Sequence, residues 1–367
     1  MQKVCRNSPR TSGRYSRGPA RCEIVEPWVL NYRLGPMTLV MIFPVQSRDC
    51  SYFCGSCQIH SVESMKSNEL SSSQPVLSTR WWGILIRLAV ALAVLSGSNY
   101  ARLPLHAWAE SHFSGDAEIV ATSVIFLLTP AVIVLGVWVW MRWIERRPIR
   151  VLRMLDARAA ASGLAGGILI IGIVMVASWA MLAGVSPAET AVSGEELTGP
   201  GGDLNNASIT ALVFFLISRS FLLQGIPEEL LYRGWLFDVL RHRPWTAFGW
   251  TTVGFVAAHL FSSGGQQSVA EHIYYLIVPL GMSVLGAALV LWRGHFWWAA
   301  GTHGGFHFWL AICSVIYPVE LGPRVWIVTG LAQMMAGVVI VCVCARRGHF
   351  ATTRSAKERF LKMGADL

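Results

Sequence analysis

The chain has 367 residues, of which 53% are hydrophobic and only 14% are charged, and its mean hydropathy is +0.48. This composition excludes an ordinary soluble domain and predicts an all-α fold, a polytopic bundle of transmembrane helices. The formal net charge of +9 gives no reason to expect a nucleic-acid partner, because no nucleic-acid-binding motif accompanies it and basic membrane loops explain it.

The N-terminal residues 1–79 are rich in Ser, Arg, Gly and Pro, and their one apolar run, Met37 to Val45, is too short to span a membrane. We predict a disordered cytoplasmic extension. A second interpretation is that this extension is not translated and that the protein starts at Met65, just ahead of the first span. The C-x3-C-x2-C spacing could hold an iron–sulfur cluster, or zinc with a nearby histidine, although no soluble domain follows to use it. Its residues are Cys50, Cys54, Cys57 and His60.

Apolar runs of about 20 residues, enough to cross a hydrocarbon core of about 30 Å, recur through the rest of the chain. We predict about eight spans, at 81–99, 118–141, 162–184, 207–226, 246–263, 272–292, 296–317 and 325–345. The predicted organisation is a set of accessory helices over 80–206, a core over 207–317, a last helix over 318–345 and a basic tail over 346–367.

Basic residues set the expected orientation, because Lys and Arg accumulate in cytoplasmic loops. They concentrate after the second, fourth and sixth predicted spans and in the tail, whereas the alternate connections hold only Arg102 and Arg324. We therefore expect a multi-pass protein of the cell membrane with both termini cytoplasmic. Arg87 and Arg219 lie within spans, where we expect each to snorkel or to pair inside the bundle.

Two adjacent carboxylates and an arginine occupy the fourth span region, where ionisable groups are costly and usually mark function. Glu229 and Arg233 are four residues apart and can pair on one helix face, which leaves Glu228 as the freer carboxylate and the candidate base. Pro227 suits a first helical turn, so we expect the helix to kink or restart at residues 225–227.

Three histidines, His259, His303 and His307, lie in the apolar second half of the chain. Counted along helices from the basic turns at 241–243 and 293–295, they reach nearly the same depth as Glu228. His303 and His307 share one helix face, and Gly304 and Gly305 would let another helix approach. These side chains should converge on one intramembrane pocket that opens towards the cytoplasm.

The three motifs resemble those of the CPBP family of intramembrane proteases, which includes the CAAX prenyl endopeptidases and bacteriocin-processing or immunity proteins. The motifs are Glu228-Glu229-x-x-x-Arg233-Gly234, Phe255-x-x-x-His259 and His303-x-x-x-His307. They occur in the family's order over residues 207–316. His307 is a departure, because the family usually has Asn at this position.

The resemblance implies an endopeptidase in which Glu228 and His259 activate a water for attack on a peptide carbonyl. His303 and His307 would stabilise the oxyanion, while Glu229, Arg233 and the motif residue Phe255 support the site. The implied partners are the lipid bilayer and a peptide or membrane-protein substrate, lipidated or not. Such chemistry needs a base within reach of water and preorganised donors in a dry site.

Two alternatives stay open. The first is a zinc-dependent metalloprotease, because Glu228, His259, His303 and His307 could supply tetrahedral ligands, whereas the glutamate mechanism requires no cofactor. The second is a protein that cleaves nothing, such as a transporter with a proton relay or an immunity scaffold that binds a peptide.

Overall fold

The computed structural model describes residues 30–34, 37–41, 75–185, 198–199, 202–203, 207–262 and 264–347. The chain divides into two units, 1–70 and 71–367. In the first unit, β1 (Leu30–Leu34) pairs antiparallel with β2 (Met37–Met41). The proposed cluster cysteines, His60, Met65 and the tail from residue 348 lie outside the described residues.

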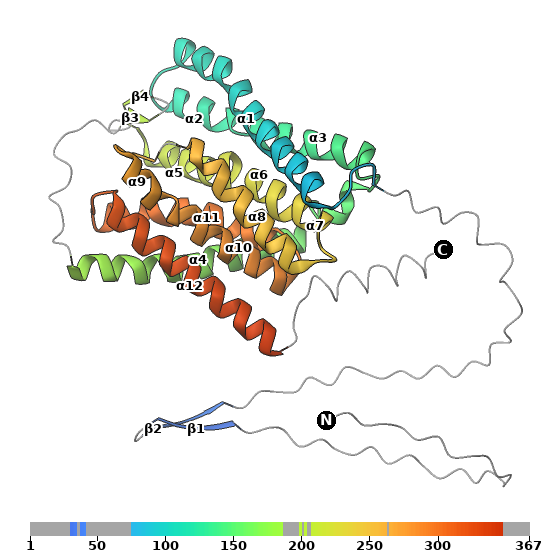
Figure 1. Cartoon of the computed structure of the whole chain (residues 1–367). Helices are drawn as coiled ribbons and strands as arrows, with labels where there is room; N and C mark the ends of the chain where they lie inside the picture. Colours follow the sequence, from blue (N-terminus) through green and yellow to red (C-terminus); the bar gives the residue numbers. More distant parts are fainter. Residues whose placement is uncertain are drawn as a thin grey trace, which may run out of the picture. The chain divides into compact units, whose positions relative to one another are not determined.

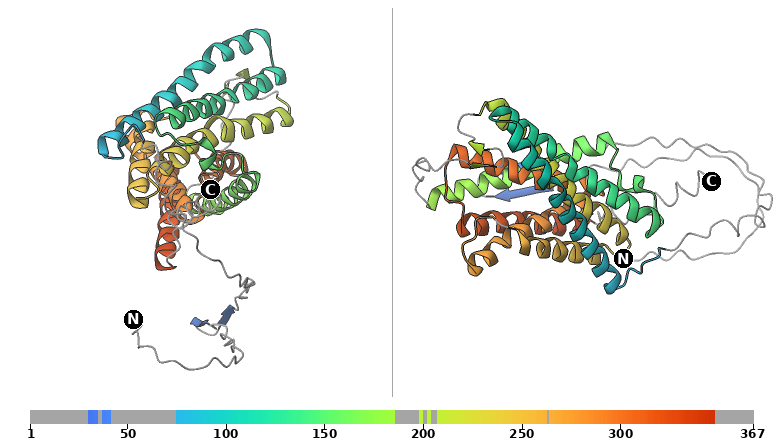
Figure 2. Two further views of the ribbon diagram at one scale, coloured as in Figure 1. Left: turned by 90° about the vertical axis from the view of Figure 1, so that its right-hand side faces the viewer. Right: turned by 90° about the horizontal axis from the view of Figure 1, so that it is seen from above.

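The second unit is built from helices, which confirms the all-α prediction, and has one two-residue ladder of β3 (Thr198–Gly199) and β4 (Gly202–Asp203). Helices α1 to α3 lie along one side of the bundle and α12 along the opposite side (Figures 1 and 2). The main helices are α1 (Trp81–His112), α2 (Asp116–Ile125), α3 (Leu128–Trp143), α4 (Ala157–Val185), α5 (Ile209–Ile217), α8 (Pro244–Ala258), α9 (Val269–Tyr275), α10 (Ile277–Arg293), α11 (Trp297–Ile316) and α12 (Pro323–Arg347).

Within the described residues, six helical stretches are long and apolar enough to cross a membrane, so the protein is a multi-pass membrane protein. They are Trp81–His112, Asp116–Trp143, Ile149–Gly184, Ile209–Val239, Val269–Arg293 and Pro323–Arg347. The other two predicted spans correspond to α8 and α11. Helix α8 has only 15 residues, and α11 has 20 but carries two histidines and several glycines, which lower its hydropathy.

The fourth span was expected to kink or restart at residues 225–227, and α-helical geometry does restart at Ile226 with Pro227 in the first turn, although the chain stays helical throughout from Ile209 to Val239. Two π-helical segments, η3 (Ser218–Gly225) and η4 (Leu230–Leu236), flank α6 (Ile226–Glu229). A wider turn ahead of a proline accommodates its ring and its missing N–H without breaking the helix. Such π segments inside α-helices occur frequently at functional sites.

The expected close approach at the α11 glycines is present. A Cβ on Gly304 would lie 2.3 Å from the Phe221 ring, and one on Gly305 would lie 2.6 Å from the Ile171 side chain. From the other side, a Cβ on Gly225 would lie 2.6 Å from the backbone nitrogen of Gly304. Helix α11 is therefore held tightly against the segment that carries the glutamates.

Arg87 pairs inside the bundle, which was one of the two alternatives predicted for it, and does not snorkel. Its Nε and Nη2 donate to the Glu145 carboxylate at 2.7 and 2.8 Å, and both side chains are buried. Its guanidinium also donates to the carbonyls of Leu77, Ser78 and Gly83. Leu77 and Ser78, which we assigned to the extension, are thus bonded to the first turns of α1. Arg219, by contrast, is exposed on η3.

Candidate active site

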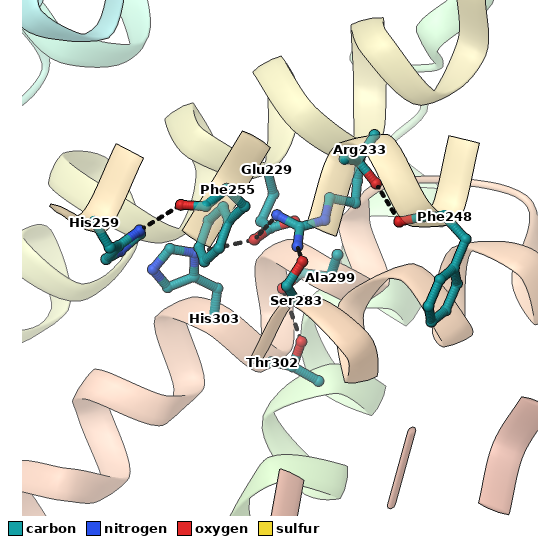
Figure 3. Close-up of polar contacts among 10 residues, drawn as sticks. Glu229, Arg233, Phe248, Phe255, His259, Ser283, Ala299, Thr302 and His303 are labelled. Carbon is teal, nitrogen blue, oxygen red and sulfur yellow. Dashed lines mark hydrogen bonds and ion pairs between the residues drawn. The ribbon is translucent and has the colours of Figure 1, made fainter. Parts of the chain in front are cut away.

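The predicted pair of Glu229 and Arg233 is present and buried, with the two residues one helical turn apart (Figure 3). Arg233 Nη1 donates to Glu229 Oε1 at 3.0 Å, and His303 Nδ1 lies 3.1 Å from the same oxygen. Arg233 Nη2 donates to the hydroxyl of Ser283 on α10. All these side chains are buried, so the group joins α6, η4, α10 and α11 in a dry region.

Phe255 contributes a fully buried aromatic ring to the site. The guanidinium carbon of Arg233 lies 4.3 Å from the centre of this ring. The ring centres of His259 and His303 lie 4.5 and 5.6 Å away. Phe255 therefore contacts the ion pair and both motif histidines, and a cation over a desolvated aromatic face contributes about 2 kcal/mol.

His259 is held in one tautomer by its own helix. Its Nδ1 lies 2.8 Å from the Phe255 carbonyl oxygen, which can only accept, so Nδ1 carries the hydrogen. In the neutral ring Nε2 is then an acceptor. It can accept a hydrogen bond from water.

Glu228 and His259 line one cavity of about 270 Å³, together with Ala258, Phe261 and Ser262. The remaining lining comes from α1. Glu228 Oε2 is buried and has no hydrogen-bond partner among the described residues. The volume is close to the lower end of the range for ligand pockets, about 300 Å³, and suits a short stretch of peptide.

The cavity lining lies at one end of α8. Helix α8 begins just after the basic turn, whereas η5 (His259–Phe261) and Ser262 lie at its far end. The lining thus extends away from the end that the positive-inside rule assigns to the cytoplasm. On the basic side, the buried Tyr232, Arg233 and Phe255 close the site.

His303 and His307 occupy a neighbouring position rather than the cavity wall itself. Their ring centres are 5.3 Å apart, His303 is buried and His307 is half-buried. With Nδ1 of His303 facing Glu229, the ring presents Nε2 to the site, and this nitrogen can donate only when both ring nitrogens carry hydrogen.

The described residues contain no group of three or more His, Cys, Asp or Glu side chains placed to hold one metal ion. The donors are divided, because Glu228 and His259 line the cavity whereas His303 is bonded to Glu229. This arrangement does not fit a zinc site of three or four protein ligands, so we derive no step through a metal. The zinc alternative stays a prediction.

Sequence reasoning missed Ser283 and the contribution of α1. Ser283 lies in an apolar helix, where one hydroxyl gives a weak signal, although its depth relative to Arg233 could have suggested a contact. On α1, Ser96 and Asn99 follow the apolar run, where polar residues are ordinarily read as the end of a span.

Residues 210–309 match the family described as type II CAAX prenyl endopeptidase Rce1-like. The match includes all three motifs from Glu228 to His307, which confirms the family predicted from them. No curated protein and no solved structure matched the chain.

Proposed function

We propose that this membrane protein, which carries an Rce1-like domain over residues 210–309, is an endopeptidase that hydrolyses a peptide bond inside the membrane with a water activated by Glu228 and His259. The observation that carries the proposal is that the Glu228 carboxylate and the His259 ring line one cavity, with His259 Nδ1 held by the Phe255 carbonyl so that Nε2 is the accepting nitrogen. Two acceptors on one cavity can hold the two hydrogens of a water molecule.

In the first step, Glu228 takes a proton from this water while the oxygen attacks the carbonyl carbon of the peptide. A bond forms between water oxygen and carbonyl carbon, and the carbonyl electrons move to its oxygen. The second hydrogen of the water stays directed at His259 Nε2. A positioned general base of this kind contributes about 10²- to 10⁴-fold to the rate.

In the second step the carbon–nitrogen bond breaks, and the proton held by Glu228 passes to the leaving amine. The products are one new carboxyl and one new amine group. We assign the developing oxyanion to His303, with His307 behind it, because Glu229 holds Nδ1 of His303 and the ring also contacts Phe255, the residue that carries His259 on its carbonyl.

Glu229 and Arg233 act as positioning residues. Their ion pair fixes η4 against α10 through Ser283 and fixes the His303 ring from behind. Because Glu228 is the immediate neighbour of Glu229 on the same helix, its direction depends on this buried pair. Preorganisation by buried, bonded groups is the ordinary way in which a site holds such geometry.

The decisive experiment compares wild type with Glu228→Gln in detergent, using mass spectrometry to detect cleavage of internally quenched peptides. We expect Glu228→Gln to lose turnover by about 10²- to 10⁴-fold with an unchanged melting temperature. Glu118→Gln, at the start of α2, is the matched control and should retain activity. If wild type and Glu228→Gln are equally inert while both bind peptide, the scaffold alternative replaces the enzyme.

A chelator separates the two catalytic alternatives. We expect the turnover rate to stay unchanged after prolonged incubation with 1,10-phenanthroline, because the described donors do not form a metal site. Loss of activity that added zinc restores would establish the zinc-dependent reaction instead.

A further inference from the structure

The cavity beside Glu228 has a second wall that belongs to α1. Leu92, Leu95, Ser96, Asn99 and Tyr100 line it, and their spacing of three, four, seven and eight residues from Leu92 forms one continuous helix stripe. The stripe is apolar at Leu92 and Leu95 and polar at Ser96, Asn99 and Tyr100. These five residues, the α1 stripe, lie outside the matched residues 210–309.

The placement of α1 explains why a cavity exists there. Near its start, α1 packs closely on α8, since a Cβ on Gly254 would lie 2.2 Å from the Leu88 side chain. The pair of Arg87 and Glu145 fixes the same end of α1 to the end of α3. Beyond this anchored end, α1 faces η5 across the cavity.

The polar half of the α1 stripe has unused bonding capacity. Asn99 Oδ1 accepts from Arg102 Nη2 at 2.6 Å, which leaves the amide nitrogen of Asn99 as a free donor. Tyr100 is 71% exposed and Ser96 is half-buried. A peptide backbone needs such donors and acceptors inside a membrane, where an unpaired polar group costs several kcal/mol.

We infer that the α1 stripe is the substrate-positioning wall of the site: Asn99, Ser96 and Tyr100 bond the backbone of the peptide, and Leu92 and Leu95 accept an apolar side chain beside the scissile bond. This inference rests on the proposed endopeptidase function. It separates the chemistry, carried by residues 228–307, from the recognition of the peptide, carried by a helix more than 100 residues earlier in the sequence.

The apolar part is tested on purified full-length protein with a library of internally quenched decapeptides, varied among Ala, Val, Leu and Phe beside the central bond. Leu92→Ala and Leu95→Ala should each shift the preference towards larger side chains, by about tenfold in relative kcat/KM. Leu105→Ala, on the same helix but off the cavity lining, is the matched control and should keep the wild-type profile. Identical profiles for all three variants would overturn the inference.

The proposed hydrogen bond from Asn99 to the peptide is tested by measuring KM. Asn99→Ala should raise KM roughly five- to tenfold with kcat unchanged, as expected for one hydrogen bond made equally in substrate and transition state. Asn99→Asp keeps the acceptor for Arg102 but removes the donor, so it should raise KM as well. If Asn99→Asp behaves as wild type, the residue acts through Arg102 and does not bond the peptide.

A crosslinking experiment distinguishes failure of this inference from failure of the proposed function. A decapeptide with a central benzophenone side chain is irradiated with the Glu228→Gln protein, and the attachment site is mapped by mass spectrometry. Attachment within residues 92–100 supports the wall even if no peptide is ever cleaved. Attachment exclusively elsewhere, or none, overturns the wall even if wild type is an active peptidase.

Discussion

Two buried pairs of arginine and glutamate serve this protein in different ways. Arg87 and Glu145 are 58 residues apart and join the start of α1 to the end of α3. Glu229 and Arg233 are one turn apart on a single helix. The first pair fixes the helix that carries the proposed recognition wall, and the second fixes the helix that carries the proposed base.

The two pairs also differ in how completely they are bonded. Every nitrogen of the Arg87 guanidinium donates to a carboxylate or a carbonyl, and Glu145 accepts a further bond from the Trp140 indole. In the second pair, Glu229 Oε2 and Arg233 Nε have no partner among the described residues. Fully satisfied buried charges specify a structure, whereas partly satisfied ones persist where function requires them.

The largest expected effect on stability is from Arg87→Ala. This change leaves Glu145 buried without its cation, which should lower the free energy of unfolding by about 3–5 kcal/mol. Thermal unfolding in detergent micelles measures it. The double variant Arg87→Met with Glu145→Leu removes both charges and should recover most of the loss, and a single variant that melts like wild type would contradict the assignment.

Glu229→Gln should act mainly on turnover. It weakens the contacts to Arg233 and His303 that orient the site, and a small displacement of reacting groups costs about 100-fold in kcat. We expect a smaller loss of stability than for Arg87→Ala, because the amide still accepts from Arg233. Glu145→Gln provides the comparison, with a larger shift in melting temperature and a smaller change in kcat. If the two variants show the same shift in melting temperature and the same loss of kcat, the two pairs do not differ in role.

Ser283→Ala tests the contact between the second pair and α10. Without the hydroxyl, Arg233 Nη2 loses its acceptor, which should cost about 1–3 kcal/mol of unfolding free energy. Ser178→Ala is the control, since this buried hydroxyl donates to Val174 within its own helix. If both alanine variants unfold alike, Ser283 contributes nothing specific to the pair.

The smallest effect concerns His295, which lines a cavity of about 30 Å³ on the basic side of Arg233. Burial, and then the charge of Arg153, lowers the pKa of His295 from its ordinary 6.5 to about 4. The unfolded chain therefore binds more protons between these values, so stability should fall as the pH falls from 6.5 towards 4. His295→Phe should flatten this part of a melting-temperature profile, and an unchanged slope would show that His295 does not cause it.

The sequence was most informative where one helix sets the geometry. The spacing of Glu229 and Arg233 predicted their pair, and the two glycines of α11 predicted a close helix contact. At Pro227 the sequence predicted the first turn of a helix, which α6 confirms, but it did not predict the π turns on either side.

The sequence by itself determined that this is a multi-pass membrane protein with an Rce1-like core and with acids and histidines at matching depth, because hydropathy, helical rise and residue spacing are properties of single segments. Only the tertiary structure decided that Glu145 pairs with Arg87, that His303 bonds Glu229, and that α1 faces Glu228 across a cavity. These contacts depend on the tilt and rotation of one helix against another, which packing sets and spacing along the chain does not.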